Sequence, residues 1–258
     1  MKPLAGRTVL VTRPADQSVE LVRRLRGLGA TPIMAPTIEI APVRSAALTT
    51  ALRELSAGRF VWITLTSRAT VEMLESRLDS PSDVRAKVAA IGDGTAATFR
   101  AWARRPPDLM PAVFTTAGLA RAFPRGDGRV LCARADIAPA GLEDALAAKG
   151  WSPVRVDAYR TRMARTLPAD AREALREGRV DAITFTSAST VRGFVGAMDV
   201  VRGNPKIVCI GPVTSREARA HGLRVSAVAK PHTIDGVMGA LERVFRGTTS
   251  ESPRRGAA

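Results

Sequence analysis

The stretch GRTVLVTR at residues 6–13 returns later in the chain as GRVLCAR at residues 128–134. Two further blocks repeat in the same order, so that each copy holds three blocks. These are residues 6–13, 63–67 and 91–95 in the first copy and residues 128–134, 183–187 and 210–214 in the second. Their shared offset of roughly 120 residues is far longer than a solenoid period, so each copy is domain-sized. The sequence therefore predicts two similar domains, and ligands commonly bind in the cleft between domains.

Short apolar strands alternate with amphipathic helices along both copies. Thr8–Thr12 is a β-branched apolar run, and Gly29 stops the helix that follows it. Further strands are expected near residues 60–65, 87–91, 129–133, 153–157, 181–185 and 206–210. This alternation predicts an α/β fold with parallel sheets flanked by helices. Continuous apolar strands such as Ile207–Ile210 suit a sheet that is covered on both faces.

The composition describes a globular protein with a large positive charge. Of its 258 residues, 45% are hydrophobic and 24% are charged, and the formal net charge is +15. Such a field favours polyanions, including nucleic acid, an acidic membrane surface or a polycarboxylate. A GC-rich genome that encodes arginine in place of lysine explains the same excess, since only five of the 39 basic residues are lysines. Because the charge is spread without a block, no nucleic-acid-binding tail is expected.

Several kinds of site are not indicated. Cys132 and Cys209 lie in apolar runs without metal-binding spacing, so we expect buried, reduced thiols. His221 and His232 are expected at the surface, and no metal site is predicted. The start of the chain lacks the apolar core of a signal peptide, and no stretch approaches the ~18 apolar residues of a membrane span. We therefore expect a cytoplasmic protein without a membrane partner, with a disordered tail at residues 248–258.

A threonine–serine pair follows one strand of each copy. Thr66-Ser67 and Thr186-Ser187 each end an apolar strand and precede a helix. At the carboxyl edge of a parallel sheet, hydroxyls beside a helix amino terminus suit a carboxylate or phosphate. Ordinary helix capping explains a single pair as well. The recurrence of the pair keeps both interpretations open.

Two glycine turns bring a threonine to the same edge. Residues 92–97 fit the G-x-G-x-x-A dinucleotide pattern, but in the second copy Pro212 follows Gly211, and no acidic residue stands at the required distance. No nicotinamide or flavin cofactor is therefore predicted. Thr95 and Thr214 are candidates for substrate binding, because each lies in the first turn of a helix at this edge.

Arg13, Arg134 and Tyr159 complete the candidate polar residues. The two arginines stand at matching strand ends and could clamp carboxylates bidentately, with solvated surface positions as the alternative. Tyr159 is the single tyrosine and lies at the foot of an extended segment. Its phenol can donate a proton to a departing hydroxyl, and a packed structural tyrosine is the alternative. With no obvious strong acid or base, such a site binds and orients an anion.

Taken in order, these motifs resemble the uroporphyrinogen-III synthase family over nearly the whole chain. The resemblance rests on residues 9–14, 66–67, 91–96, 159–161, 186–187 and 210–214. It implies a cofactor-free, monomeric lyase of tetrapyrrole (heme) biosynthesis. The implied substrate is hydroxymethylbilane, a linear tetrapyrrole with an acetate and a propionate on each ring. The family removes its terminal hydroxyl, inverts the last pyrrole through a spiro intermediate and closes the ring to uroporphyrinogen III.

The resemblance also implies roles for the residues above. Tyr159 assists departure of the hydroxyl, and Ser67, Thr95, Ser187 and Thr214 contribute cleft contacts. The full predicted substrate-binding set adds Arg13, Thr66, Arg134 and Thr186. The one protein partner expected is hydroxymethylbilane synthase, which would hand over the substrate in a transient contact.

The resemblance further implies a division of the chain that the repeat does not determine. Consecutive halves split near Gly126 would give the same offsets. The implied active site lies in the cleft between two domains that a two-stranded linker joins. The implied parts are a discontinuous domain of residues 1–36 and 161–247, an inserted domain of residues 42–156, and linker strands at residues 37–41 and 157–160.

Two departures from the family pattern leave an alternative function open. Residues 68–70 read Arg-Ala-Thr where the family usually has a proline- or asparagine-containing turn. Ala135 follows Arg134 where a glycine is common. The alternative is a non-catalytic, two-domain binding or regulatory paralogue that holds an acidic small molecule.

Overall fold

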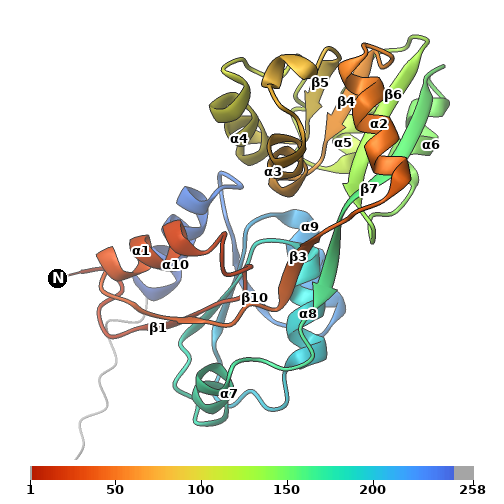
Figure 1. Cartoon of the computed structure of the whole chain (residues 1–258). Helices are drawn as coiled ribbons and strands as arrows, with labels where there is room; N and C mark the ends of the chain where they lie inside the picture. The colour runs from red at the N-terminus through yellow and green to blue at the C-terminus, as the bar shows by residue number, and fades with distance from the viewer. Residues whose placement is uncertain (1, 247–258) are drawn as a thin grey trace, which may run out of the picture. The chain divides into compact units, whose positions relative to one another are not determined.

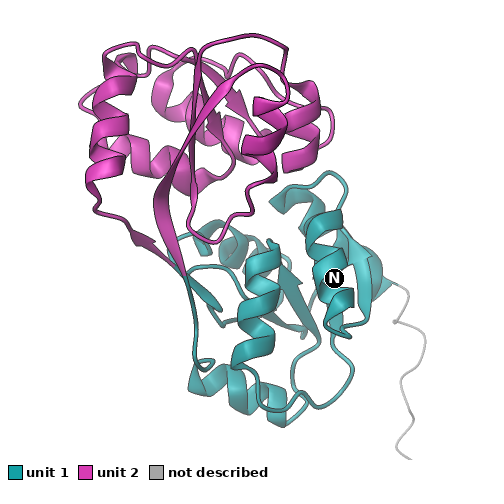
Figure 2. Cartoon of the chain, turned by 90° about the vertical axis from the view of Figure 1, so that its right-hand side faces the viewer, with its two compact units in different colours: residues 1–39, 162–258 teal, residues 40–161 magenta. Residues whose placement is uncertain are grey.

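The computed structural model describes residues 2–246, and the tail predicted at residues 248–258 lies outside them. The chain folds into two compact units, one of residues 1–39 with 162–258 and the other of residues 40–161 (Figure 2). Each unit is built on a five-stranded sheet with helices against it (Figure 1). The predicted α/β class with helix-flanked parallel sheets is confirmed.

In the first unit the strand order is β10-β9-β8-β1-β2, and each neighbouring pair is parallel. The strands are β1 (Thr8–Val11), β2 (Thr31–Met34), β8 (Ala182–Phe185), β9 (Lys206–Cys209) and β10 (Val225–Val228). The helices are α1 (Val19–Gly27), α7 (Ala169–Arg176), α8 (Ala188–Ala197), α9 (Pro212–Ala220) and α10 (Ile234–Arg246). Val9 and Val11 pack with residues of α1 and α10, whereas Leu10 packs with residues of α7 and α8. Because both faces of the sheet carry a core, its strands are continuously apolar.

In the second unit the strand order is β3-β7-β6-β4-β5. The strands are β3 (Ile38–Pro42), β4 (Trp62–Leu65), β5 (Lys87–Ala90), β6 (Arg129–Ala135) and β7 (Ser152–Met163). The helices are α2 (Ala46–Ser56), α3 (Arg68–Arg77), the 3₁₀ turn η1 (Pro81–Asp83), α4 (Asp93–Ala103), α5 (Thr116–Ala122) and α6 (Gly141–Ala147). Leu131 of β6 belongs to a core with α2 and α3, and Val130 belongs to a core with α5 and α6.

Each sheet combines strands from both copies of the repeat. β1, from the first copy, pairs with β8 of the second, and β4 of the first copy pairs with β6 of the second. The consecutive split near Gly126 is therefore not the one that the chain adopts. The chain passes between the units within β3 and again within β7. The predicted linker segments, residues 37–41 and 157–160, fall largely on these strands; their role as a linker and the domain boundaries remain predictions.

Helix α8 approaches the chain closely just before β3. A Cβ added at Gly193 would lie 2.2 Å from the carbonyl oxygen of Thr37, whereas one added at Gly196 of the same helix would meet nothing within 4 Å. The buried hydroxyl of Thr37 lies 3.1 Å from the carbonyl oxygen of Thr12 and 2.9 Å from that of Thr190. These hydrogen bonds fix Thr37 against α8. Position 193 of the helix therefore has no room for a side chain.

We expect Gly193→Ala to destabilise the protein by about 1–3 kcal/mol, because the methyl group forces the helix and a fixed carbonyl apart. Gly196→Ala is the matched control and should stabilise by about 0.5–1 kcal/mol, since alanine favours helix more than glycine. Urea unfolding of both variants measures the difference. Equal free energies of unfolding would contradict the close approach.

Candidate functional site

The carboxyl edge of the second sheet gathers the residues predicted for this unit. Thr66 and Ser67 follow β4, Thr95 lies in α4 after β5, Arg134 stands near the end of β6, and Tyr159 belongs to β7. These strands are neighbours in the order β7-β6-β4-β5 and run parallel. Their carboxyl ends therefore lie at one edge of the sheet, where α/β proteins bind ligands.

Tyr159 and Ser67 form a hydrogen-bonded pair at this edge. The phenol donates to Ser67 Oγ at 2.8 Å, and the same Oγ accepts the N–H of Thr70 at 3.1 Å as the cap of α3. Ser67 is thus a helix cap, as one of the two interpretations expected. The serine oxygen that caps α3 is also the acceptor of the phenol O–H. Only 8% of Tyr159 is exposed, and burial is the main cause that raises the pKa of its phenol. The phenol is therefore a protonated donor at neutral pH.

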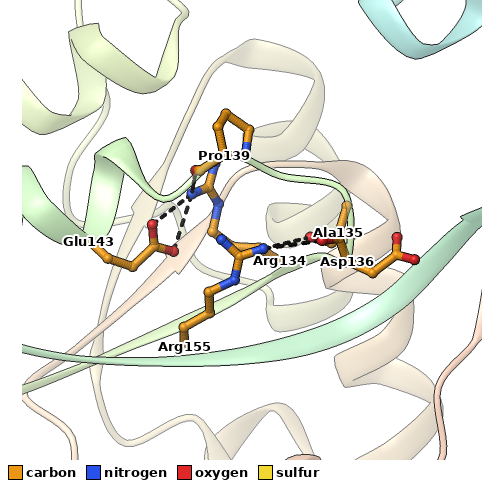
Figure 3. A network of polar contacts seen from close by, with 6 residues as sticks. All are labelled: Arg134, Ala135, Asp136, Pro139, Glu143 and Arg155. Carbon is orange, nitrogen blue, oxygen red and sulfur yellow. Dashed lines mark hydrogen bonds and ion pairs between the residues drawn. The ribbon is translucent and has the colours of Figure 1, made fainter.

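Arg134 lies in a buried ion pair (Figure 3). Its Nη1 lies 3.1 Å and 2.9 Å from the two carboxylate oxygens of Glu143 and donates to the carbonyl of Pro139 at 2.8 Å. The exposed fractions of the Arg134 and Glu143 side chains are 3% and 11%. The carboxylate that Arg134 binds is thus one of the chain itself, and its contact with a substrate remains a prediction.

An arginine that the motifs did not single out lies beside Gly94, in the first turn of α4. The N-cap residue of α4 is Gly92, which has no side chain to cap the helix, and Thr95 is buried in the first turn. A Cβ added at Gly94 in this turn would lie 3.1 Å from Nε of Arg68, the first residue of α3. A guanidinium next to an uncapped helix amino terminus favours an anion. The place of Arg68 directly after Ser67 is the sequence signal that points to it.

The first unit has a similar edge of its own. Ser187 caps α8 by accepting the N–H of Thr190 at 3.1 Å, and Thr186 lies just before it, half-buried. Thr214 is buried in the first turn of α9, whose N-cap residue, Gly211, has no side chain to cap the helix. The capping interpretation therefore holds for Ser187 as well, and Thr214 matches Thr95 of the other unit.

The first unit lacks a counterpart of the phenol. Val9 lies opposite Pro32 in β1 and β2, as Val130 lies opposite Pro153 in β6 and β7, so β2 is the counterpart of β7. Tyr159 is the single tyrosine of the sequence, so β2 and the residues that follow it carry no phenol.

Arg13, which matches Arg134, follows β1 and is buried, and its Nη2 donates to Gln17 at 3.4 Å. Among the described residues, Arg13 thus contacts the side-chain amide of Gln17, whereas Arg134 contacts the carboxylate of Glu143.

Other reactive groups are not arranged for chemistry. Cys132 and Cys209 are free and buried as predicted, and burial raises the pKa of each thiol to about 12, so neither is a nucleophile. His221 and His232 are exposed, also as predicted. Within residues 2–246, no three histidine, cysteine or acidic side chains are grouped to hold a metal ion. No helix in the same range has the length and apolarity needed to cross a bilayer.

Comparisons with known proteins agree with the motifs. Residues 19–239 match the family described as uroporphyrinogen-III synthase HemD. A uroporphyrinogen-III synthase of Synechococcus elongatus is 34% identical over 96% of this chain and 99% of its own length. A porphyrin biosynthesis protein HemD of Ruminiclostridium josui is 32% identical over 95% of this chain and 50% of its own length.

Solved structures share the fold. A mutant uroporphyrinogen III synthase of Thermus thermophilus superposes with a TM-score of 0.68 at 22% identity, covering 93% of this chain and 99% of that one. The uroporphyrinogen-III synthetase of Helicobacter pylori gives a TM-score of 0.61 at 17% identity, covering 92% and 99%.

We expect Glu143→Ala to lower the free energy of unfolding by about 3–5 kcal/mol, because it leaves the buried Arg134 guanidinium without its carboxylate. Glu20→Ala is the control, since Glu20 pairs with Arg24 in an exposed i,i+4 contact at 3.4 Å. That change should cost about 0–1 kcal/mol. Chemical unfolding of both variants makes the comparison, and a similar small loss in each would show that the Arg134 pair is solvated.

Because Tyr159 is the only tyrosine, its ionisation can be followed by tyrosinate absorbance without interference from a second phenol. We expect the native protein to ionise at a higher pH than the unfolded chain, whose phenol titrates near pH 10. Since the folded pKa is the raised one, the stability linked to this group is present below the unfolded pKa. It is lost as pH rises through the folded pKa. Identical midpoints with and without denaturant would contradict the burial of the phenol.

Proposed function

We propose that this chain, which belongs to the uroporphyrinogen-III synthase family, converts hydroxymethylbilane into uroporphyrinogen III. The proposed reaction eliminates the terminal hydroxyl as water, inverts the last pyrrole through a spiro intermediate and closes the macrocycle. That chemistry makes the enzyme a lyase. Family membership over most of the chain and the 34% identity to a relative of that name support the proposal.

The observation that carries the proposal is the Tyr159–Ser67 pair at the carboxyl edge of the second sheet. A buried, protonated phenol can donate to the departing hydroxyl when its single O–H turns from Ser67 Oγ to the substrate, and the Ser67 hydrogen bond holds the phenol in place before that step. Ser67 is itself immobilised as the cap of α3 through the N–H of Thr70. Because the substrate loses hydroxide readily, the enzyme's main contribution is to hold the linear chain in a ring-closing geometry.

The carboxylates of the substrate fit the positive character of the two sheet edges. In the second unit, Arg68 lies beside the uncapped first turn of α4, where Thr95 is buried. In the first unit, Thr214 occupies the matching turn, and Arg13 follows β1. We assign these residues to substrate carboxylates, and the formal net charge of +15 supports attraction of a polycarboxylate.

Membership of the family also suggests the cofactor requirement, location, oligomeric state and partner of the proposed enzyme. No cofactor or metal has a place in the reaction. The two buried, free thiols support a reducing, cytoplasmic location. We propose a monomer that receives the unstable bilane by transient handover from hydroxymethylbilane synthase.

A coupled assay tests the function. When porphobilinogen and hydroxymethylbilane synthase are supplied, adding the protein should shift the product from the type I to the type III uroporphyrinogen isomer, as separated by chromatography after oxidation. In the same assay, Tyr159→Phe should lower kcat at least ~10-fold, since it removes the only proton on the phenol side chain that can reach the leaving group. Type I product alone from folded wild-type protein would instead favour a non-catalytic paralogue that binds acidic molecules.

A further inference from the structure

Strands β6 and β7 lose their regular register just before Tyr159. The pairs run in step as far as Arg134 opposite Asp157, but the next pair is Ala135 opposite Tyr159. Ala158 is therefore an extra residue on β7, which forms a bulge. A bulge turns the strand locally and re-aims the side chains beside it, and it leaves unpaired backbone that other groups must hold.

Asp136, the first residue after β6, supplies these groups. Its N–H donates to the carbonyl of Tyr159 at 3.1 Å. Its Oδ1 accepts the N–H of Thr161 at 3.0 Å and also the N–H of Ile137 at 2.9 Å. Asp136 thus holds β7 at two places, through its backbone N–H at Tyr159 and through its carboxylate at Thr161.

The loop that carries Asp136 is itself fixed by two arginines (Figure 3). Nη2 of Arg155, on β7, lies 3.3 Å from the carbonyl oxygens of both Ala135 and Asp136. Nη1 of Arg134 donates to the carbonyl of Pro139 further along the loop at 2.8 Å. The buried arginine at the strand end therefore has a supporting role that does not require a ligand.

We propose that Asp136 is a positioning residue for Tyr159, which holds the bulged backbone of β7 so that the phenol meets Ser67 Oγ. The phenol hydrogen bond of 2.8 Å is near the optimum for an O–H donor. A backbone shift of about 1 Å would weaken it, and misplacements of this size can cost up to ~100-fold in rate. The kinetic consequence rests on the proposed function, whereas the position of the phenol does not.

The chemistry of the contact separates this role from a purely electrostatic one. Oδ1 of Asp136 accepts two backbone N–H groups, and the amide oxygen of asparagine can accept the same two. Asp136→Asn therefore keeps the side-chain contacts to Ile137 and Thr161 and removes the charge. Asp136→Ala removes these contacts as well as the charge and keeps only the backbone N–H that donates to Tyr159. If these side-chain hydrogen bonds position the phenol, the asparagine variant should resemble the wild type.

The test uses the single tyrosine as its probe. Protein labelled with ¹³C at the tyrosine ζ carbon gives one resonance from Tyr159, so a change at the phenol is read without an activity assay. We expect Asp136→Ala to shift this resonance and to lower kcat about 10-fold with KM changed less than ~2-fold. Asp136→Asn should restore the resonance and kcat to near the wild-type values.

Asp108→Ala is the matched control in the same unit. Asp108 also accepts a strand N–H, that of Val88 at 2.8 Å, and pairs with Arg105, but it lies beside β5, which β4 and β6 separate from β7. Its loss should lower stability and leave the tyrosine resonance unchanged.

An unmoved resonance in Asp136→Ala would overturn the proposal, and so would an asparagine variant as impaired as the alanine one. Should Asp136→Ala not fold, Arg155→Met removes the donors to the other side of the loop and should shift the same resonance; no shift there is equally contrary. A wild-type protein that yields no type III isomer would refute the proposed function alone, since the resonance is measured without turnover.

Discussion

The parallel hydrogen bonds that join β1 to β8 and β4 to β6 are the interaction on which both units depend. In each case the pairing brings a strand from one copy of the repeat to the centre of a sheet completed by the other copy. Side chains follow the backbone: Leu10 and Ile183 share one core, and Ile63 and Leu131 share another. The central strand of each sheet, β8 or β6, belongs to the second copy and has a first-copy strand as one neighbour, so neither copy alone supplies a complete sheet.

The two sheet edges have kept their geometry and diverged in chemistry. Each has a serine-capped helix and a buried threonine in an uncapped first turn. Only the second has a phenol, because Tyr159 is the single tyrosine of the sequence. The buried arginines differ as well, since Glu143 faces Arg134, whereas Val22 is at the matching position of the first unit. Proton donation is thus assigned to one edge, and both edges keep features that suit anions.

Local pattern was sufficient to predict most of the strands, the helix stop at Gly29 and the serine positions, because those depend on neighbours in sequence, but it missed β10. Strand partners were not predictable in this way: Thr12 donates to the carbonyl of Thr184, 172 residues along the chain. The expectation that Arg134 faces a ligand missed Glu143, which reaches it from a helix nine residues on. Asp136 gave no sequence signal, since its partners come together only at the bulge in β7.

The route of the chain also sets the order in which it can fold on the ribosome. The middle segment, residues 40–161, has its strands β4, β5, β6 and most of β7 as soon as it has emerged. β1 and β2 are synthesised first, but the sheet that they belong to is completed only when β8, β9 and β10 have been synthesised. The earliest apolar strands therefore remain without their full sheet the longest. The middle segment can therefore complete most of its sheet before the first unit does, although domains usually fold in N-terminal-first order. The exposed early strands are the stage at which a nascent chain would most need a chaperone.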